Sequence, residues 1–511
     1  MLNRRITGFD MTRWIAITLF AIMFSVCATC VAHADTQLRN GVLGSGTTWE
    51  TRWHAIESDQ PGPTVLIIGG VHGNEPAGFR AAEQIVHWPI VRGKLVVLPS
   101  VNRLGLAANI RWYPEFRNDR TKRDLNRNFP TKSRPEALTP LCQAIWKFVQ
   151  QQEPDWVFDL HEGFDFHRIN SKSVGSSVIA FPAQADFAKK LLSAVNADVE
   201  PERHFALLAR SGPINGSLAR ACGEQLGAKS FILETTFKEQ AISLRTRQHR
   251  RMVSTALLDI GLINNDCVDH LAPPAKPEVT RVALFDDAGA NEAKVLRVID
   301  NQAEFSVTHV GPKDMRQEVL QQFDVIVFPG GSGSKQGKAI GSGGRDHVRQ
   351  FVDDGGGVIG ICAGAFLCSS HYDWSLQLMN AAVFNKMVDI PEKGKKSMWF
   401  RGPATDVDVE ITEAGSKVLG IEGRQSIRYQ NGPILSPGKH PALPTYEPLA
   451  FFRSENGIYE AQKNTMIGAP AVVFVQYGQG RVLAISPHFE STKGAEAVVR
   501  RAIRHVRRCE N

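Results

Sequence analysis

The chain has 511 residues, with 59 Lys and Arg against 52 Asp and Glu, a formal net charge of +7, and 43% hydrophobic residues. This length allows two or more domains. The mild, scattered positive charge argues against nucleic acid as a partner, and the short basic run RTRQHRR (Arg245–Arg251) is interpreted as solvated surface.

The first 34 residues have the pattern of a secretory signal peptide. Arg4, Arg5 and Arg13 precede an apolar run, Trp14–Val31, and an A-x-A motif follows at Ala32–Ala34. The alternative is an uncleaved transmembrane anchor, but the run is marginal in length and the A-x-A motif favours cleavage. We therefore expect a secreted or periplasmic protein that keeps no stable membrane anchor.

Six cysteines follow the predicted cleavage site. They form no C-x-x-C pair, so a cysteine zinc knuckle is not expected. An oxidising compartment permits disulfides, but the sequence does not give their pairing. These cysteines are Cys142, Cys222, Cys267, Cys362, Cys368 and Cys509.

Short apolar runs alternate with amphipathic segments along the whole chain. This alternation predicts α/β layers with mainly parallel sheet, interrupted near residue 275 by the proline-rich stretch HLAPPAKPEVT. We predict two three-layer αβα domains at 35–270 and 281–511, joined by a linker at 271–280. The predicted strands are 64–70, 94–100, 155–161, 230–236, 281–287, 323–331 and 356–364, and the predicted helices include 76–88 and 138–151.

Candidate metal ligands follow two of the predicted strands. His72 and Glu75 lie in LIIGGVHGNEPAG, and His161 lies in FDLHEG. Because ligands gather at the carboxyl ends of strands in open α/β sheets, these side chains are expected to meet. Two histidines and one carboxylate are a common catalytic zinc set, which leaves one position open. Glu234, an acidic residue inside the apolar run FILETTF, is the candidate general base and acid.

A third motif, RDLNRNFP, offers an amide and a guanidinium in one turn. Asn126 and Arg127 suit a substrate carboxylate, although an arginine here also fits a structural salt bridge.

The motifs HGNE, DLNRNFP, DLH and LET, in this order over residues 60–255, resemble the zinc carboxypeptidase superfamily. The likeness is greatest to its succinylglutamate desuccinylase/aspartoacylase branch and to murein peptide amidases. It implies a mixed sheet, one Zn²⁺ on His72, Glu75 and His161, and Glu234 as base and acid. It also implies Asn126 and Arg127 as the carboxylate site.

The resemblance leaves two features of the first half open. An upstream arginine that polarises the scissile carbonyl could be Arg117, Arg120 or Arg123, and Arg120 is favoured. The tyrosine found over the substrate in digestive carboxypeptidases has no counterpart before Glu234. Glu162 and His167 are either groups that orient the ligands or ordinary loop residues.

The second half contains a strand-to-helix turn, GGGVIGICAGAFLCSS, with Cys362 at its apex. Such an elbow presents a nucleophile, and RVLAISPHFEST supplies His488 and Glu490 as a base and an orienter. The glycine-rich turn FPGGSGS (Phe328–Ser334) could furnish oxyanion-binding amides. Cys368, six residues after Cys362, is interpreted as core.

Residues 280–505 resemble the class I glutamine amidotransferase-like, flavodoxin-like fold, closest to the biotin-protein-ligase N-terminal type. The resemblance rests on FPGGSG, GICAGAF, RYQNGP and SPHFE, and it implies a Cys362, His488 and Glu490 triad. Glutaminases carry a glutamine after the glycine that follows the nucleophile, whereas Ala365 and Phe366 follow Gly364 here. The alternative is a retained scaffold with a buried Cys362.

We therefore expect an exported zinc hydrolase that cleaves an amide next to a free carboxylate, as a carboxypeptidase or murein-peptide amidase does. Its partner would be a peptide or an N-acyl amino acid. Three alternatives stay open: an N-acyl amino acid deacylase, a binding protein for carboxylate or cell-wall ligands, and an amidase that depends on the thiol of Cys362.

Overall fold

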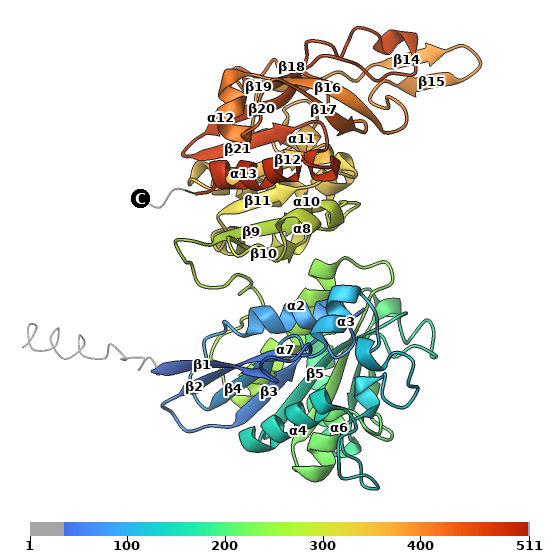
Figure 1. Cartoon of the computed structure of the whole chain (residues 1–511), viewed down its shortest axis with the longest axis vertical. Coiled ribbons are helices and arrows are strands. Elements are labelled where there is room, and N and C mark those ends of the chain that lie inside the picture. Colours follow the sequence, from blue (N-terminus) through green and yellow to red (C-terminus); the bar gives the residue numbers. More distant parts are fainter. Residues whose placement is uncertain (1–34, 509–511) are drawn as a thin grey trace, which may run out of the picture.

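The computed structural model describes residues 35–508, so the predicted signal peptide and Cys509 lie outside the described residues. The chain forms two α/β domains, the first drawn blue to green and the second yellow to red (Figure 1). This confirms the predicted fold class. Between residues 35 and 508, no helix combines the length and the apolar character needed to cross a membrane.

The first domain is built on an eight-stranded mixed sheet in the order β1-β2-β4-β3-β5-β8-β6-β7. Its centre, β4-β3-β5-β8, is parallel, while β1, β2 and β6 join by antiparallel pairing. The strands are β1 (Thr36–Leu43), β2 (Thr51–Ser58), β3 (Thr64–Ile68), β4 (Lys94–Leu98), β5 (Trp156–Gly163), β6 (Ser177–Ala180), β7 (Ala206–Leu208) and β8 (Lys229–Thr236).

Helices cover both faces of this sheet. Val65 and Ile67 of β3 pack with α2, α5 and α7, whereas Leu66 and Ile68 pack with α4 and α6. Alternate side chains of a strand point to opposite faces, so the continuous apolar run of β3 feeds two cores at once. The helices are α2 (Pro76–Ile85), α3 (Arg103–Ala108), α4 (Pro140–Gln152), α5 (Ala185–Asn196), α6 (Leu218–Gln225) and α7 (Ile242–Ile260).

The second domain has a nine-stranded sheet that is parallel over one half and antiparallel over the other. The parallel half is β10-β9-β11-β12-β21, and β20-β19-β16-β17 continue it in antiparallel pairing. The strands are β9 (Thr280–Phe285), β10 (Phe305–Val310), β11 (Val325–Phe328), β12 (Gly357–Ile361), β16 (Thr405–Ile411), β17 (Arg424–Tyr429), β19 (Glu447–Phe452), β20 (Pro470–Tyr477) and β21 (Gly480–Ile485).

Two small ribbons and six helices complete the second domain. The β14–β15 hairpin projects from the end of this domain that is remote from the first (Figure 1). The ribbons are β13 (Ala381–Val383) with β18 (Leu435–Pro437), and β14 (Met387–Ile390) with β15 (Gly394–Ser397). The helices are α8 (Ala293–Ile299), α9 (Gln317–Leu320), α10 (Gly333–Asp353), α11 (Ala363–Cys368), α12 (Glu413–Leu419) and α13 (Glu496–Val506).

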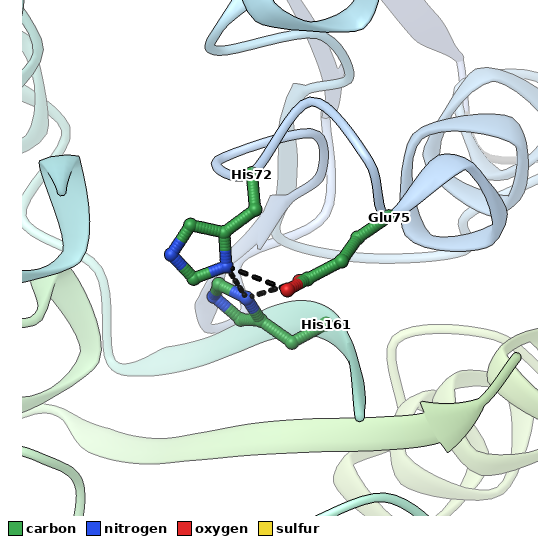
Figure 2. Close-up of side chains that lie close together, drawn as sticks. All are labelled: His72, Glu75 and His161. Atoms are coloured by element: carbon green, nitrogen blue, oxygen red, sulfur yellow. Dashed lines mark hydrogen bonds and ion pairs between the residues drawn. The ribbon is translucent and has the colours of Figure 1, made fainter. Parts of the chain in front are cut away.

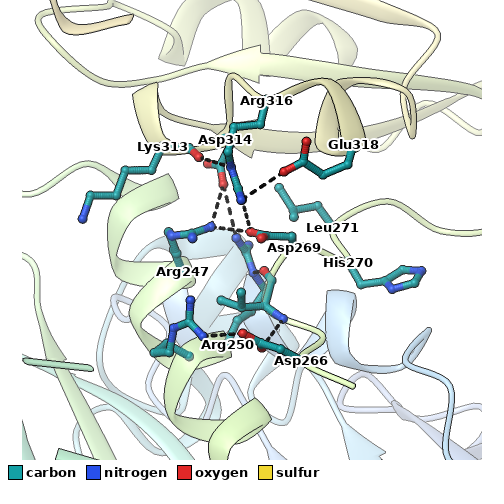
Figure 3. A network of polar contacts seen from close by, with 12 residues as sticks. Arg247, Arg250, Asp266, Asp269, His270, Leu271, Lys313, Asp314, Arg316 and Glu318 are labelled. Atoms are coloured by element: carbon teal, nitrogen blue, oxygen red, sulfur yellow. Dashed lines mark hydrogen bonds and ion pairs between the residues drawn. The ribbon is translucent and has the colours of Figure 1, made fainter. Parts of the chain in front are cut away.

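The two domains meet through buried charges on α7 (Figure 3). Nη2 of Arg250 lies 3.6 Å from Oδ1 of Asp314 in the second domain, and Nη1 of Arg247 lies 3.4 Å from the same oxygen. Arg247 also pairs with Asp269 at 2.7 Å, and Asp269 in turn pairs with Arg316 of the second domain. The α7 helix therefore belongs to the core of one domain and to its contact with the other.

This arrangement corrects the interpretation of the run RTRQHRR as solvated surface. Arg250 is fully buried, and Arg245 and Arg247 are 6% and 9% exposed. Buried arginines persist where carboxylates and carbonyls satisfy them, and the carboxylates here come from distant parts of the chain. The local composition therefore predicted solvent exposure for arginine side chains that are in fact buried.

Replacing Asp314 by Asn should destabilise the protein by about 3–5 kcal/mol, because the change keeps the volume but leaves Arg250 buried beside a neutral amide. The shift in the urea denaturation midpoint measures this effect. Lys417→Met, which removes only an exposed pair with Glu413, is the control and should leave the midpoint unchanged. An equal midpoint for D314N and wild type would contradict the structural role of this network.

Candidate functional site

The turn between β3 and α2 carries two of the predicted ligands. Gly70 has a positive φ of 67°, and a Cβ at Gly73 would lie 2.0 Å from the backbone carbon of Gly105. Glycine is therefore required at both positions, for conformation and for close approach. The turn directs His72 inward and ends at Glu75, which is the N-cap residue of α2.

His72, Glu75 and His161 converge at the carboxyl end of the sheet (Figure 2). Nδ1 of His72 lies 2.9 Å from Oε1 of Glu75, Nδ1 of His161 lies 2.9 Å from Oε2, and the two Nδ1 atoms are 3.1 Å apart. All three residues are at most 3% exposed. The edges of a tetrahedral zinc site with bonds of about 2.0 Å are roughly 3.3 Å long. The donor atoms therefore fit zinc with a small adjustment.

The outer nitrogens of both histidines face carboxylates. Nε2 of His72 hydrogen-bonds Oδ1 of Asp124 at 3.1 Å, and Nε2 of His161 lies 3.1 Å from Oδ1 of Asp159. A carboxylate at Nε2 fixes the tautomer in which Nδ1 keeps its lone pair for a metal. This second observation, independent of the clustering itself, also fits a zinc site.

The charged groups of this cluster shift the pKa of Glu75 and the pKa of His161 in opposite directions. Burial alone would raise the pKa of Glu75, but His72 and His161 hold it well below its usual range. Burial would lower the pKa of His161, but Asp159 and Glu75 raise it well above its usual range.

Glu234 faces the cluster from the adjacent strand. It is paired in register with His161 across β5 and β8, it is 7% exposed, and its Oε2 has no hydrogen-bond partner among residues 35–508. Burial raises the pKa of Glu234 to about 8, against the lowering effect of His161. A carboxyl with such a pKa can hold and release a proton near neutral pH.

Asn126 and Arg127 lie beside the cluster in a short 3₁₀ turn, Leu125–Arg127. Nδ2 of Asn126 is 3.5 Å from Nε2 of His161, and its buried Oδ1 has no partner in the described part of the chain. Arg127 is exposed and donates to the carbonyl of Asn126 at 2.8 Å. No carboxylate within residues 35–508 forms an ion pair with Arg127, so its guanidinium is available to a ligand.

The arginine in contact with the ligands is Arg111, which the sequence did not indicate. Its Nη1 lies 2.8 Å from Oε1 of Glu75, and its Nη2 lies 3.5 Å from Oδ2 of Asp124. Arg117 and Arg120 are exposed, and Arg123 stacks on Trp112 with its guanidinium carbon 4.4 Å from the ring centroid. The assignment of Arg120 to carbonyl polarisation stays a prediction.

Glu162 is a structural support of the cluster. Its side chain accepts from the amide of Ala77 at 2.8 Å and pairs with Arg245, while its own amide donates to Oε2 of Glu75 at 3.1 Å. It therefore connects α7, the start of α2 and a ligand. His167 is half-buried and bonds the carbonyl of Ser173 at 2.7 Å, away from the cluster.

The residues of the second predicted site, Cys362, His488 and Glu490, also lie close together. Cys362 sits between β12 and α11 at φ 50° and ψ −99°, a conformation that non-glycine residues rarely adopt. Nδ1 of His488 lies 2.6 Å from Oε1 of Glu490. A Cβ at Gly330 would lie 3.3 Å from Cε1 of His488 and 3.7 Å from Cβ of Cys362, so both residues border the Phe328–Ser334 turn.

The other described cysteines are structural. Cys142, Cys222, Cys267 and Cys368 are buried free thiols, and burial raises the pKa of each. Cys368 lies in the core cluster of the second domain, as expected. Within residues 35–508, no disulfide forms.

Solved structures similar to this chain include two of Csd4 from Helicobacter pylori. The Gln46His variant is 21% identical over 44% of this chain and 62% of that chain, with a TM-score of 0.34. The mDAP-bound form, described as a D,L-carboxypeptidase, is 21% identical over 40% and 52%, with a TM-score of 0.32. This chain thus covers less than two thirds of these two Csd4 chains. A succinylglutamate desuccinylase/aspartoacylase from Rhodobacter sphaeroides is 19% identical over 45% and 66%, with a TM-score of 0.32.

No curated protein matches the chain. Residues 61–257 match the family described as "Succinylglutamate desuccinylase/Aspartoacylase catalytic domain", and residues 288–508 match the family described as "Biotin-protein ligase, N terminal". The first match spans the whole His72, Glu75 and His161 cluster, and the second spans Cys362 and His488. The chain therefore carries a catalytic domain of the succinylglutamate desuccinylase/aspartoacylase family followed by a domain of the biotin-protein-ligase N-terminal family.

Proposed function

We propose that the chain is an exported zinc hydrolase that cleaves an amide bond next to a free carboxylate, in a peptide or a murein-derived peptide. The observation that carries the proposal is the convergence of two Nδ1 atoms and one carboxylate, with the buried Glu234 paired in register with His161. Export rests on the signal-peptide pattern of the first 34 residues.

Each side chain of the zinc site has its own role in the proposed reaction. His72, Glu75 and His161 would hold the zinc, which when bound supplies a Lewis acid that polarises a carbonyl and acidifies water. Asp124 and Asp159 keep the histidine rings oriented. Glu234 accepts a proton at its unpaired carboxylate oxygen and delivers it to the leaving nitrogen.

Substrate recognition falls to Asn126 and Arg127. The guanidinium of Arg127 has no protein carboxylate to neutralise it within residues 35–508, and its planar fork matches a free carboxylate. Arg111 differs because it is already engaged by Glu75 and Asp124. A carboxylate held by Arg127 would place the neighbouring amide beside the zinc ligands.

A second candidate is deacylation of N-acyl amino acids. The family match over residues 61–257 favours it, because the family is described by a desuccinylase and an aspartoacylase. Both reactions would use the same zinc ligands and the same base, and both substrates carry a free carboxylate on the nitrogen side of the amide, so they differ in the size of the acyl group that the pocket must accept. Parallel assays of peptides and N-acyl amino acids therefore separate them.

The purified protein should contain about one zinc per chain, and His72→Ala should abolish binding, because removal of one of three protein ligands breaks the site. Metal analysis after reconstitution with zinc measures this. His167→Ala is the matched control, since His167 bonds Ser173 outside the cluster, and it should retain the metal. Wild-type protein that takes up no zinc on reconstitution would rule out the proposal.

Glu234→Gln should keep the zinc and lose about 10²–10⁴-fold in kcat/KM, because glutamine has the shape of a protonated glutamate but carries no transferable proton. The measurement uses whichever carboxylate-bearing peptide or N-acyl amino acid the wild type hydrolyses best. Activity within threefold of wild type in a zinc-loaded variant would remove Glu234 from the mechanism.

Arg127→Lys should raise KM about tenfold for a substrate with a free carboxylate, since a lysine loses the bidentate contact. The same variant should behave like wild type toward the substrate with its carboxylate amidated, and this comparison serves as the control. Arg120→Met should instead lower kcat if Arg120 polarises the carbonyl. An unchanged KM in R127K would place the carboxylate site elsewhere.

A further inference from the structure

The first turn of α7 has no capping side chain in its own domain. The N-cap residue, Ala241, has the extended backbone of such a position (φ −64°, ψ 155°), but its methyl side chain makes no capping hydrogen bond. The amide of Ser243 nevertheless has a partner, because it donates to Oδ2 of Asp286 at 2.9 Å. Asp286 directly follows β9, so a residue of the second domain caps a helix of the first.

Asp286 is built into the domain contact. The strands β9 and β10 lie at the side of the second domain that faces the first, and α7 contacts β10 (Figure 1). Asp286 is 7% exposed, and the amide of Ser243 is the only hydrogen-bond donor to its carboxylate among residues 35–508. Nδ1 of His309 lies 3.2 Å from the same oxygen. A Cβ at Gly311 would lie 2.7 Å from Oγ of Ser243, so the second domain approaches this turn of α7 closely.

The capped turn carries Arg245, which supports a zinc ligand through one intermediate residue. Arg245 lies two residues after Ser243, and its Nε donates to the carbonyl of Ala241 at 3.3 Å. Its Nη1 pairs with Oε1 of Glu162. The amide of Glu162 in turn donates to Oε2 of Glu75 at 3.1 Å. The position of the helix start therefore determines where the guanidinium meets Glu162.

Glu162 depends on this guanidinium. It is 3% exposed, and Arg245 is the only cation that forms an ion pair with it in the described part of the chain. A buried carboxylate that loses its partner is costly, so Glu162 would shift toward another donor or toward water. Its amide would shift as well, and with it the hydrogen bond to Glu75. Glu162 also directly follows the ligand His161, so both ligands are close to this disturbance.

We propose that Asp286 is a positioning residue of the zinc site, contributed by the second domain. Asp286 fixes the start of α7, the helix fixes Arg245, and the guanidinium fixes the residue that bonds Glu75. This inference rests on the proposed zinc site of the first domain. It gives the second domain a role in that site that does not depend on the chemistry of its own Cys362.

The zinc affinity of the full-length protein tests this role without a substrate. Competition with a chelator gives the dissociation constant of zinc for wild type, Asp286→Ala and Asp286→Asn. Asp286→Ala should raise this constant about tenfold, the lower end of the effect of groups that act through a ligand's own partner. Asp286→Asn keeps the volume and an oxygen that can accept from Ser243 but loses the charge at the helix start, so it should raise the constant about threefold.

Ala241→Ser provides a rescue. Because Ala241 already has the backbone of an N-cap residue, a serine there can accept from the amide of Ser243. Added to Asp286→Ala, it should return the zinc dissociation constant to within about twofold of wild type. The double variant restores the cap but not the carboxylate beside His309, so it separates the two contacts of Asp286. The visible absorption bands of the cobalt-substituted protein, which respond to ligand geometry, should change in Asp286→Ala and recover in the double variant.

Asp324→Ala is the matched control. Asp324 is as buried as Asp286, lies in the second domain and also accepts from a backbone amide, that of Arg281 at 2.8 Å. It lies just before β11, and none of its hydrogen bonds or ion pairs involves α7. Asp324→Ala should lower the urea denaturation midpoint, as Asp286→Ala does, but it should leave the zinc dissociation constant unchanged.

Hydrogen exchange of the metal-free protein measures the intermediate steps. In Asp286→Ala, the amides of the first turn of α7 and the amide of Glu162 should exchange about fivefold faster than in wild type, because the cap and the bond to Glu75 are both weakened. The same amides should be unchanged in Asp324→Ala. A wild type that takes up no zinc would refute the proposed function of the first domain, and these exchange rates would still decide whether Asp286 positions Glu75.

The inference fails on any of three results. A zinc dissociation constant in Asp286→Ala equal to that of wild type would limit Asp286 to holding the domains together. An Ala241→Ser change that brings no recovery would show that Asp286 does not act through the start of α7. An equal loss of zinc affinity in Asp324→Ala would show that the effect is a general loss of stability.

Discussion

The buried ion pair between Arg245 and Glu162 is the contact on which the catalytic half of the molecule depends. Glu162 is 3% exposed, so its charge requires a partner inside the protein, and Arg245 of α7 supplies it. The same carboxylate caps the amide of Ala77, and the backbone of Glu162 donates to Glu75. One ion pair thereby fixes the helix, the turn and the ligand relative to one another.

The α7 helix extends this constraint to the second domain. Arg247 and Arg250, two and five residues after Arg245, meet Asp314 across the domain contact, and the amide of Ser243 donates to Asp286 at 2.9 Å. Buried charges therefore hold α7 on both sides of the domain contact. Burial lowers the pKa of Arg250 to about 10, which still leaves it charged at neutral pH.

Much of this architecture could be predicted from short sequence patterns, and the failures have physical causes. Continuous apolar runs such as β3 indicate strands that are buried on both faces. In contrast, β1 is mostly exposed and β16 is half-exposed, so neither stands out by its hydrophobicity. In the antiparallel half of the second sheet this explains why β16 was missed, whereas β20 is an apolar run whose pairing direction the sequence does not give. A single sequence also cannot show which distant carboxylate neutralises an arginine, and this is why the run at Arg245–Arg251 was misread.

The candidate site also contains some residues that local sequence patterns predict and others that they do not. His72, Glu75 and His161 were found because each lies just beyond or at the end of an apolar run. Asp159 could have been found as well, since residues two apart in a strand share a face and Asp159 precedes His161 by two. Arg111 could not, because no local pattern links an arginine in an irregular loop to a carboxylate 36 residues earlier.

Two buried glutamates, Glu234 and Glu490, show how environment assigns a role to one residue type. Each is at most 7% exposed and has one carboxylate oxygen without a hydrogen-bond partner among the described residues. Glu490 has an imidazole nitrogen 2.6 Å away, so its charge is committed to orienting His488 through Nδ1. Glu234 has no such partner, and burial raises its pKa to about 8. The carboxylate of Glu490 therefore orients a base, whereas the carboxylate of Glu234 is free to act as a base itself.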